Sequence, residues 1–332
     1  MTALLENPLT DPGNLKIHAA QAEIVTWQDR QALRLEDGLV LIPGHRAVDA
    51  SVEVLIGTDG AAYPGIAFRV VDVLNYDLAY AVPHASGQWD ALQYDPVFHG
   101  SNTWQMYHGP CYQCAAQVPT GRWFRLRVDF CGSRAAVAVD GQSPLVVERL
   151  AHPVADGLFG LWTFRPAYFS NLRISTFNEM DAPRGEMPHA PAGAVEAWFA
   201  EGYGAVACEP NGVLNLNRYL PALLGEVRLT RRFEMPEEGE VTFECGFSDG
   251  LSLALDGEKV FEGENTFQGF ADRPARGYVE QEQGMRSVRR MLSPGVHCLV
   301  AVLRVSEGFG WGLALVVHTG GENLRWLPVE FG

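Results

Sequence analysis

The chain has 332 residues, of which 47% are hydrophobic and 20% are charged, so it can bury a large core and is not a disordered chain. Its 40 acidic and 25 basic residues give a net charge of -15, and an acidic surface repels nucleic-acid phosphates and anionic lipids. No run approaches the roughly 20 apolar residues of a membrane helix. Nucleic-acid and membrane partners are therefore not expected.

Glycine and proline are frequent, with 35 and 20 residues, and they are spread along the chain instead of forming a repeat. This distribution fits short strands joined by tight turns better than long helices. At about 100 to 200 residues per domain, two domains are expected. The predicted fold class is all-β, with two antiparallel β-sandwich domains.

Strand patterns dominate the first half, as runs of about four to eight residues that are mostly bounded by Gly, Pro, Asp or Asn. In WFRLRVDF, residues 123–130, apolar and charged side chains alternate, which predicts a half-buried antiparallel strand. Asp140 and Gly141 follow the next run and predict a hairpin turn. The predicted strands are 32–35, 39–42, 50–56, 65–71, 76–82, 103–107, 123–130, 135–139 and 172–177.

A proline-rich stretch without periodicity, which includes Pro183, Pro188 and Pro191, predicts a linker. The predicted organisation is a first domain at 1–178, a linker at 179–195 and a second domain at 196–332. Residues 195–200 fit either a short helix or a strand. The two halves do not align as repeats, which indicates two different sandwiches. The predicted strands of the second half are 226–233, 240–246, 251–255, 259–261, 296–305 and 312–318.

The N-terminal text MTALLENPLTDPGNLK lacks the basic start and apolar core of a signal peptide. A cytoplasmic location is therefore expected, with secretion as the alternative if the sequence is a processed form.

Free thiols are the default for the six cysteines in a reducing compartment. Cys111 and Cys114 have the spacing of half a zinc site, but no second pair completes it, so a disulfide or metal site is only the alternative to ordinary thiols.

Several stretches of the first half resemble the concanavalin A-like, or laminin G-like, jelly-roll domains of bacterial proteins. They are GIAFRVVDVLNYDLAYAVPHASGQWDALQY, NTWQMYHG, RWFRLRVDFCGSRAAVAVDG and YFSNLRIS. The second half resembles a galactose-binding-like jelly roll through RRFEMPEEGEVTFECGFSDGLSLALDGEKVFEG and FGWGLAL. The resemblance implies two jelly-roll sandwiches of a kind that often binds sugars, while other members bind proteins or lipids.

The catalytic patterns of that superfamily are not matched. A glucanase-type E-x-D-x-x-E strand is absent from the sequence, and the nearest strand, ASVEVLIG, offers only Glu53. The arginine and tyrosine strands of the lyase type are absent as well. Membership of those enzyme families is therefore not implied.

The densest mixture of aromatic and polar residues lies between residues 80 and 108. Sugar recognition uses aromatic faces for the apolar side of the ring, and amides or carboxylates for its hydroxyls, so this stretch predicts a sugar-binding groove. The alternative is that the rings pack under a long loop whose polar residues cap its own backbone. The predicted ligand-binding residues are Arg69, Tyr80, Gln93, Tyr94, Asn102, Trp104, Gln105 and Tyr107.

Strand parity adds Arg69 to this set, because in a regular strand it lies on the face opposite Phe68 and Val70. In the predicted strand 103–107, Gln105 and Tyr107 share a face, so these side chains and Arg69 are expected to line one sheet. The alternative for Arg69 is a solvated sheet face.

If the groove is catalytic, its acid and base groups are His84, Asp90, Asp95 and His108, because cleavage of a glycosidic bond needs a proton donor opposite a nucleophile or an activated water. Structural hydrogen bonding is the alternative role for each of them. No cofactor is predicted. Asp72, Asn75 and Asp77 give a calcium alternative in a loop between strands, although the same residue types form plain turns.

The sequence therefore predicts a two-domain β-sandwich protein that recognises a carbohydrate or glycoside, with its principal groove on the first domain. Two alternatives remain open. One is a glycoside hydrolase or lyase with an Asp/His pair in that groove, and the other is a non-catalytic assembly module.

Overall fold

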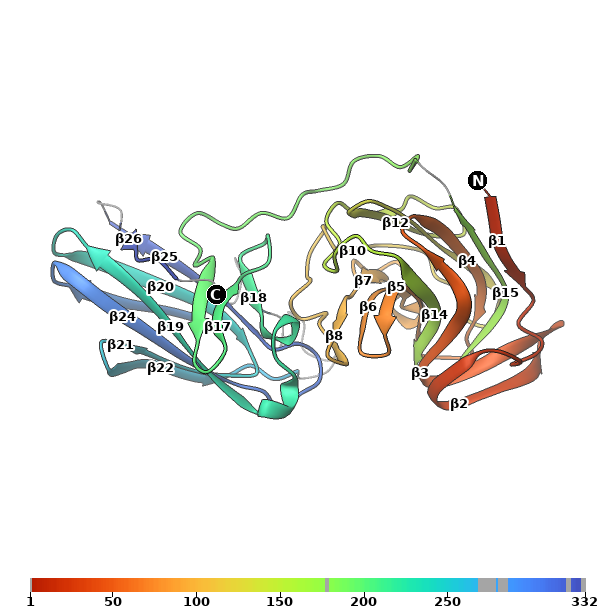
Figure 1. The fold of residues 1–332 in the computed structure, drawn as a ribbon, viewed down its shortest axis with the longest axis horizontal. Coiled ribbons are helices and arrows are strands. Elements are labelled where there is room, and N and C mark those ends of the chain that lie inside the picture. Colours follow the sequence, from red (N-terminus) through yellow and green to blue (C-terminus); the bar gives the residue numbers. More distant parts are fainter. Residues whose placement is uncertain (1, 177–178, 268–278, 280–285, 321–323, 330–332) are drawn as a thin grey trace. The chain divides into compact units, whose positions relative to one another are not determined.

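The structure is a computed structural model that describes residues 2–176, 179–267, 279, 286–320 and 324–329 (Figure 1). The named elements are strands and three single-turn 3-10 helices, η1 (Pro83–Ala85), η2 (Leu216–Arg218) and η3 (Ala222–Leu224). The strand pairs with a defined register are antiparallel. The predicted all-β sandwich class is confirmed. Within the described residues, no helix has the length and apolar character needed to cross a membrane.

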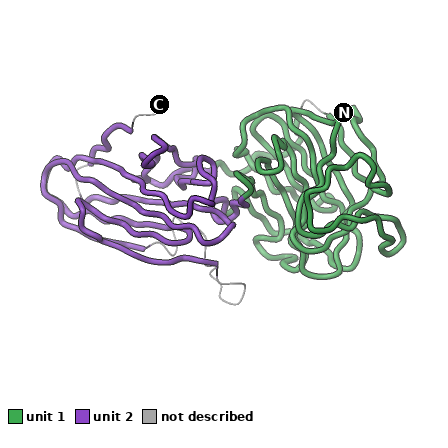
Figure 2. The backbone as a smooth tube through the Cα atoms, turned by 60° about the horizontal axis from the view of Figure 1, so that its bottom comes forward, with its two compact units in different colours: residues 1–100, 109–187 green, residues 101–108, 188–332 purple. Residues whose placement is uncertain are grey.

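The chain forms two compact units, shown in green and purple in Figure 2. Unit 1 consists of residues 1–100 and 109–187, and unit 2 consists of residues 101–108 and 188–332. The predicted first domain at 1–178 contains residues 101–108, whose contacts place them in unit 2. Unit 2 is therefore built from two segments that are distant in sequence.

Unit 1 contains a long sheet that folds over on itself. Its strand order is β10-β7-β6-β5-β14-β3-β15-β4-β11-β12-β13, with β1 paired to β15 and β2 paired to β3. The strands are β1 (Thr2–Asn7), β2 (Lys16–Trp27), β3 (Arg30–Ala47), β4 (Ala50–Gly57), β5 (Tyr63–Asp72), β6 (Asn75–Ala81), β7 (Leu92–Tyr94), β8 (Val97–Phe98), β10 (Gln113–Cys114), β11 (Phe124–Cys131), β12 (Arg134–Val139), β13 (Leu145–Val147), β14 (Gly157–Phe164) and β15 (Ala167–Thr176).

Strand β3 joins the two layers of this sandwich. Its residues up to Leu35 pair with β15, whereas those from Gly38 onward pair with β14. Gly38 has a φ of 151°, and a Cβ there would lie 2.3 Å from a backbone oxygen of β2, so only glycine fits where β3 changes partner. Between the layers, Phe68 of β5 stacks on Phe130 of β11 with ring centroids 4.9 Å apart.

The alternation predicted for β11 is confirmed. Phe124, Leu126, Val128 and Phe130 are at most 1% exposed, while the charged residues between them lie on the other face. Burying each such apolar side chain contributes about 1.5 to 3 kcal/mol, so this strand is a principal source of core stability. The predicted strand 172–177 is the end of β15, although its last residue lies outside the described part of the chain.

The predicted hairpin turn is present, and a second Asp-Gly turn of the same kind lies in unit 2. Asp140 and Gly141 have φ values of 49° and 73°, and Asp256 and Gly257 have values of 51° and 86°. The second pair joins β21 and β22 directly, as a two-residue hairpin with positive φ at both positions does.

Unit 2 has a seven-stranded sheet with the path β17-β16-β19-β24-β21-β22, to which β26 adds at β19, and a four-stranded sheet β18-β25-β20-β23. Residues 197–200 form a strand, so the strand is the correct one of the two alternatives, short helix or strand, that the sequence left open for 195–200. Phe233 and Phe243, on different sheets, pack with centroids 6.3 Å apart. The strands are β9 (Ser101–Asn102), β16 (Ala197–Ala200), β17 (Gly204–Ala207), β18 (Val213–Asn215), β19 (Glu226–Met235), β20 (Gly239–Ser248), β21 (Gly250–Leu255), β22 (Glu258–Glu264), β23 (Arg286–Leu292), β24 (Gly295–Arg304), β25 (Gly312–Thr319) and β26 (Arg325–Trp326).

The hairpin at Asp256 also holds a histidine of β24. His297 Nδ1 lies 2.6 Å from Asp256 Oδ2, and Nε2 lies 2.8 Å from the Ser293 carbonyl oxygen. Burial lowers the pKa of His297, but these two acceptors and the charge of Asp256 outweigh it and raise the pKa above the ordinary 6.5. The protonated ring therefore stabilises unit 2 fully below that value, and this contribution is lost as the pH rises through the folded-state pKa.

We expect Asp256→Asn to lower the free energy of unfolding more at about pH 5.5 than at about pH 8.5, because the variant loses the partner of the charged ring. Asparagine keeps an acceptor for the N–H of Cys298, which Asp256 Oδ1 binds at 2.8 Å. Urea unfolding at the two pH values measures the difference. A loss of stability that is equal at both would contradict the assignment.

Candidate functional site

One sheet face of unit 1 carries a cluster of aromatic side chains, here named the aromatic face: Tyr63, Tyr80, His84, Trp162 and Phe164. They come from β5, β6, η1 and β14. Centroid distances are 4.9 Å from Tyr63 to His84, 5.8 Å from Tyr63 to Phe164 and 5.8 Å from Tyr80 to Trp162. Phe164 is 49% exposed and His84 is exposed, whereas Tyr63 and Trp162 are half-buried. The cluster therefore presents ring surface to solvent.

A glycine explains how two of these rings meet. Gly65 of β5 pairs with Trp162 of β14 on one side and with Tyr80 of β6 on the other. A Cβ at Gly65 would lie 2.7 Å from the Cβ of Tyr80, so the position has no room for a side chain. Because the middle strand offers only backbone there, the rings of Tyr80 and Trp162 approach each other across it.

Amide side chains border the aromatic face. Tyr80 Oη donates to Gln93 Oε1 at 3.0 Å, and Gln113 Nε2 donates to the same oxygen at 3.0 Å. Gln93 Nε2 in turn donates to the Asp90 carbonyl oxygen at 2.9 Å. Gln93 and Gln113 are only 6% and 3% exposed, so these bonds hold the ring of Tyr80 in place and are not open to a ligand.

The electrostatics of the face depend on Arg165 and Asp90. Partial burial lowers the pKa of His84, the charge of Arg165 lowers it further, and Asp90 opposes both. The imidazole is therefore neutral at pH 7. Burial likewise raises the pKa of Tyr63, so this phenol stays protonated.

The parity argument for Arg69 is wrong because β5 contains a bulge. Between the pairs Ala67 with Gly160 and Val70 with Leu158, β5 has two residues and β14 has one. Arg69 takes a φ of 49° there, and its guanidinium carbon lies 5.4 Å from the centroid of Phe130 in the core. It donates to the Gly132 carbonyl oxygen and is 1% exposed, so it does not line the aromatic face.

Two further predicted residues belong to an enclosed polar network. Tyr94 Oη donates to Asp77 Oδ1 at 2.6 Å and accepts from the Ala151 N–H at 2.7 Å. Tyr94, Asp77 and Asp95 are each 0% exposed. Burial raises the pKa of Asp77, with His152, Tyr94 and Arg69 acting against it. A ligand on the surface does not reach these groups.

The calcium alternative gives way to the plain turn. Asp72 Oδ1 accepts from the Leu74 N–H at 2.7 Å and from Asn75 Nδ2 at 3.0 Å, while Asn75 Oδ1 accepts from the His99 N–H. Asp77 points into the enclosed network instead. In the described part of the chain, no group of three or more His, Cys, Asp or Glu side chains is arranged to hold a metal ion.

The remaining predicted residues, Asn102, Trp104, Gln105, Tyr107 and His108, belong to unit 2. The predicted strand 103–107 is wrong, since these residues form a turn closed by Met106 N–H on the Thr103 carbonyl oxygen. Gln105 is 0% exposed and Tyr107 is 2% exposed. Gln105 Oε1 accepts from Ser248 Oγ at 2.6 Å, and the ring of Trp104 lies 5.6 Å from that of Phe309.

All six cysteines lie in the described residues, and none of them forms a disulfide. Burial raises the pKa values of Cys111 and Cys114 to about 11, with a contribution from Glu186 at Cys111. Their thiols are therefore protonated at neutral pH and weakly reactive.

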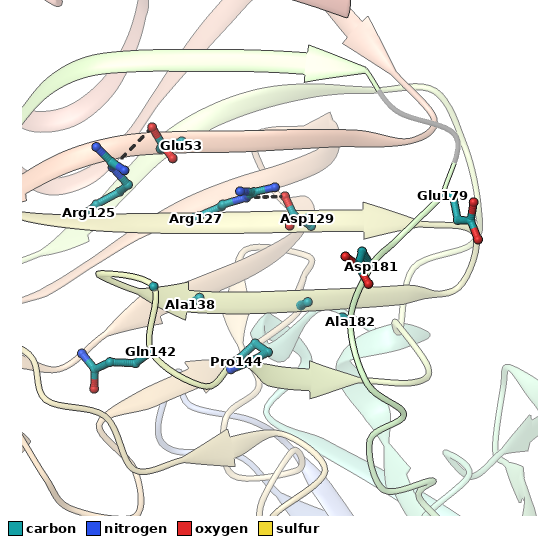
Figure 3. Close-up of a pocket in the computed structure, with 12 residues that line it drawn as sticks. Glu53, Arg125, Arg127, Asp129, Ala138, Gln142, Pro144, Glu179, Asp181 and Ala182 are labelled. Carbon is teal, nitrogen blue, oxygen red and sulfur yellow. Dashed lines mark hydrogen bonds and ion pairs between the residues drawn. The ribbon is translucent and has the colours of Figure 1, made fainter. Parts of the chain in front are cut away.

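A second surface of unit 1 contains a polar groove of about 460 Å³ (Figure 3). Arg125 pairs with Glu53 at 3.3 Å and Arg127 with Asp129 at 2.8 Å, as the dashed lines show. The groove exists because β12 places alanines beside this charged row. It is lined by Glu53, Arg125, Arg127, Asp129, Ala136, Ala138, Gly141, Gln142, Pro144, Glu179, Asp181 and Ala182. None of these lining residues is aromatic, and both arginines already have carboxylate partners.

His84, Asp90, Tyr80 and Gln93, which the sequence singles out, lie at or beside the aromatic face, whereas Tyr63, Trp162 and Phe164 were not among the predicted residues. The available signal was the run GLFGLWTF at 157–164, where a glycine and two large rings alternate with residues of the core face. For the polar groove, no sequence pattern other than the position of Glu53 pointed to its lining residues.

No family model matches the chain, and no curated protein matches it. Among the solved structures that are similar to about half of the chain, three serve as examples. The first is a carbohydrate-binding module, CBM66, from Bacillus subtilis, which is 17% identical over 47% of this chain and 92% of its own length, with a TM-score of 0.37. The second is a protein of unknown function with a galectin-like fold from Bacillus subtilis, which is 9% identical over 53% of this chain and 96% of its own length, with a TM-score of 0.41. The third is a β-glucanase from Bacillus licheniformis, which is 10% identical over 53% of this chain and 99% of its own length, with a TM-score of 0.34. At such low identities and TM-scores, the function of this chain has to be argued from its own side chains.

Proposed function

We propose that the chain binds a carbohydrate on the aromatic face of unit 1. The observation that carries the proposal is the meeting of Tyr80 and Trp162 across Gly65, beside the partly solvent-open rings of Tyr63 and Phe164. The apolar side of a sugar ring packs on such surfaces, while its hydroxyls need hydrogen-bonding groups with fixed directions. The exposed imidazole of His84, whose ring packs against Tyr63, is a group of this kind.

Binding is favoured over cleavage by the burial of the candidate acids. Glycoside hydrolysis needs two carboxyl groups, or equivalents, on either side of the scissile bond. Asp90 is 6% exposed and Asp95 is 0% exposed, so a sugar on the surface does not contact both. The proposal therefore assigns recognition to this face and no bond cleavage.

The aromatic face is also favoured over the polar groove of Figure 3. The groove is a hollow of about 460 Å³, but its charges pair with each other, and its apolar lining consists of alanine and proline side chains. Stacking on a ring buries more apolar surface than contact with a methyl group.

A glycan array on the wild-type chain, followed by titration calorimetry with the best glycan, tests the proposal. Trp162→Ala is expected to weaken binding about tenfold, which corresponds to about 1.4 kcal/mol, because the variant loses a ring in the centre of the contact. Trp162→Phe retains a ring and is expected to lose less.

Two control variants locate the effect. Phe199→Ala removes an exposed aromatic side chain, 47% exposed, from unit 2, and Ala138→Trp fills the polar groove. Both are expected to bind as the wild type does. Binding that is abolished by Ala138→Trp but kept by Trp162→Ala would move the site to the groove, and absence of any glycan binding would refute the proposal.

A further inference from the structure

An arginine with a fixed backbone stands at the border of the aromatic face. Arg165 directly follows β14, with a φ of 69°. Its N–H donates to Asp37 Oδ1 at 2.6 Å, and its carbonyl oxygen accepts from Thr163 Oγ1 at 2.8 Å. The backbone of this residue is therefore held on both sides, although its side chain is exposed.

The guanidinium of Arg165 lies beside the rings. Its central carbon is 5.8 Å from the centroid of Phe164, the most exposed ring of β14. Its charge also acts on His84 and Tyr63, where it lowers the pKa of each group. The positive charge is therefore directed at the same surface on which the sugar is proposed to stack.

Within the described residues, no carboxylate lies at ion-pair distance from Arg165. Two other exposed arginines of unit 1 do have such partners: Arg46 pairs with Asp156 at 2.9 Å, and Arg125 pairs with Glu53 at 3.3 Å. Asp37, the acidic residue nearest in the hydrogen-bond network, binds the backbone N–H of Arg165 and not its guanidinium. In a chain with a net charge of -15, an arginine kept apart from carboxylates has its donors available for a ligand.

We propose that the aromatic face selects an acidic sugar, a uronic acid residue whose carboxylate pairs with Arg165. The guanidinium presents a planar fork of donors that matches a carboxylate in two hydrogen bonds, and a neutral sugar offers no such partner. The inference rests on the proposed function, because the sugar ring must still stack on the neighbouring aromatic side chains. The other titratable groups of this surface are Asp90, neutral His84 and the phenols of Tyr63 and Tyr80, so Arg165 supplies its positive charge.

The test uses trisaccharides of galacturonic acid and glucuronic acid, each beside its methyl ester, which keeps the sugar and removes the charge. Calorimetry on the wild-type chain is expected to show at least one acid binding about tenfold more tightly than its ester, since a charge-assisted bidentate pair forms only with the acid. Arg165→Gln is expected to reduce that preference to about threefold or less, while affinity for the ester stays unchanged. Arg165→Lys keeps the charge without the planar fork and is expected to retain an intermediate preference.

Arg125→Gln is the matched control, because it removes another exposed arginine of unit 1, and it is expected to keep the wild-type preference. Equal binding of acids and esters by the wild type would overturn the inference, and so would an undiminished preference in Arg165→Gln. In either case, neutral glycans that still require Trp162 would leave the proposed function intact. If neither acidic nor neutral glycans bind, the proposed function fails, and this inference fails with it.

Discussion

Replacing Met106 with alanine is expected to lower the free energy of unfolding of unit 2 by about 2 to 5 kcal/mol, the usual cost of truncating a buried methionine. Met106 is 1% exposed, although it lies in a segment that precedes most of unit 2 by about 80 residues of sequence. Its side chain occupies the space beside Gly310 and Gly312, where an added Cβ would lie 3.1 Å from Met106 Cε and 2.3 Å from Met106 Sδ. Truncation therefore leaves a cavity at the start of β25.

The backbone around Met106 adds to this dependence. Its carbonyl oxygen accepts from Asn211 Nδ2 at 3.2 Å, and the neighbouring Gln105 accepts from Ser248 Oγ at the end of β20. Residues 101–108 thus fill part of unit 2 and also hydrogen-bond to it. Unit 2 without this segment lacks a piece of its own core.

Hydrogen exchange resolved by segment measures the effect of Met106→Ala. Protection is expected to fall in β18, β20 and β25 of unit 2, and to stay at the wild-type level in β11 and β12 of unit 1. Met187→Ala is the control, because Met187 is 55% exposed and its truncation should change stability by less than about 0.5 kcal/mol. Protection lost in unit 1 with unit 2 unchanged would contradict the assignment of residues 101–108.

The sequence predicts features that depend on neighbouring residues. The alternation of β11 and the two Asp-Gly hairpins are set by side-chain period and by positive φ, and both are visible in a few letters. The run at 103–107 alternates in a similar way, yet it folds as a turn, because its partners lie in residues 188–332 and not in a neighbouring strand. Periodicity alone does not reveal that choice.

The candidate site depends on features that no local pattern contains. A single extra residue in β5 turns Arg69 from the outer face into the core, and strand parity has no means of detecting the bulge. Tyr63 and Phe164 meet only because β5 and β14 are neighbours in the sheet, although they are far apart in the sequence. The polar character of residues 80–95 was visible, but the rings that complete the aromatic face were not.

Glu148→Ala is expected to lower the free energy of unfolding of unit 1 by about 3 kcal/mol, the lower end of the cost of breaking a buried ion pair. The Glu148 side chain is 3% exposed and accepts from Arg134 in a two-bond pair at 2.8 and 3.0 Å. It also binds Arg184 Nη1 at 3.0 Å and the Gly185 N–H at 2.7 Å. The lower end applies because Arg184 is 78% exposed and can return to water.

The effect of Glu148 depends on pH in a defined direction. Burial raises the pKa of Glu148, but the Gly185 N–H and the two arginines outweigh it and hold the pKa below the ordinary 4.5. The stability that the carboxylate contributes is therefore complete above that value, and it is lost as the pH falls through the folded-state pKa. The difference in unfolding free energy between wild type and Glu148→Gln should be largest near neutral pH and should shrink on acidification.

Urea unfolding of the wild type, Glu148→Ala and Glu148→Gln across this range measures both effects. Glu53→Gln is the matched control: it removes a carboxylate whose partner Arg125 is 53% exposed, and such surface pairs contribute about 1 kcal/mol or less. A Glu148 variant as stable as this control would show that the buried pair contributes little.

Because Glu148 holds Arg184 and Gly185, its loss should also increase hydrogen exchange at Gly185, just beyond the groove wall formed by Glu179, Asp181 and Ala182. The carboxylate that stabilises unit 1 thereby also fixes the segment that borders its polar groove.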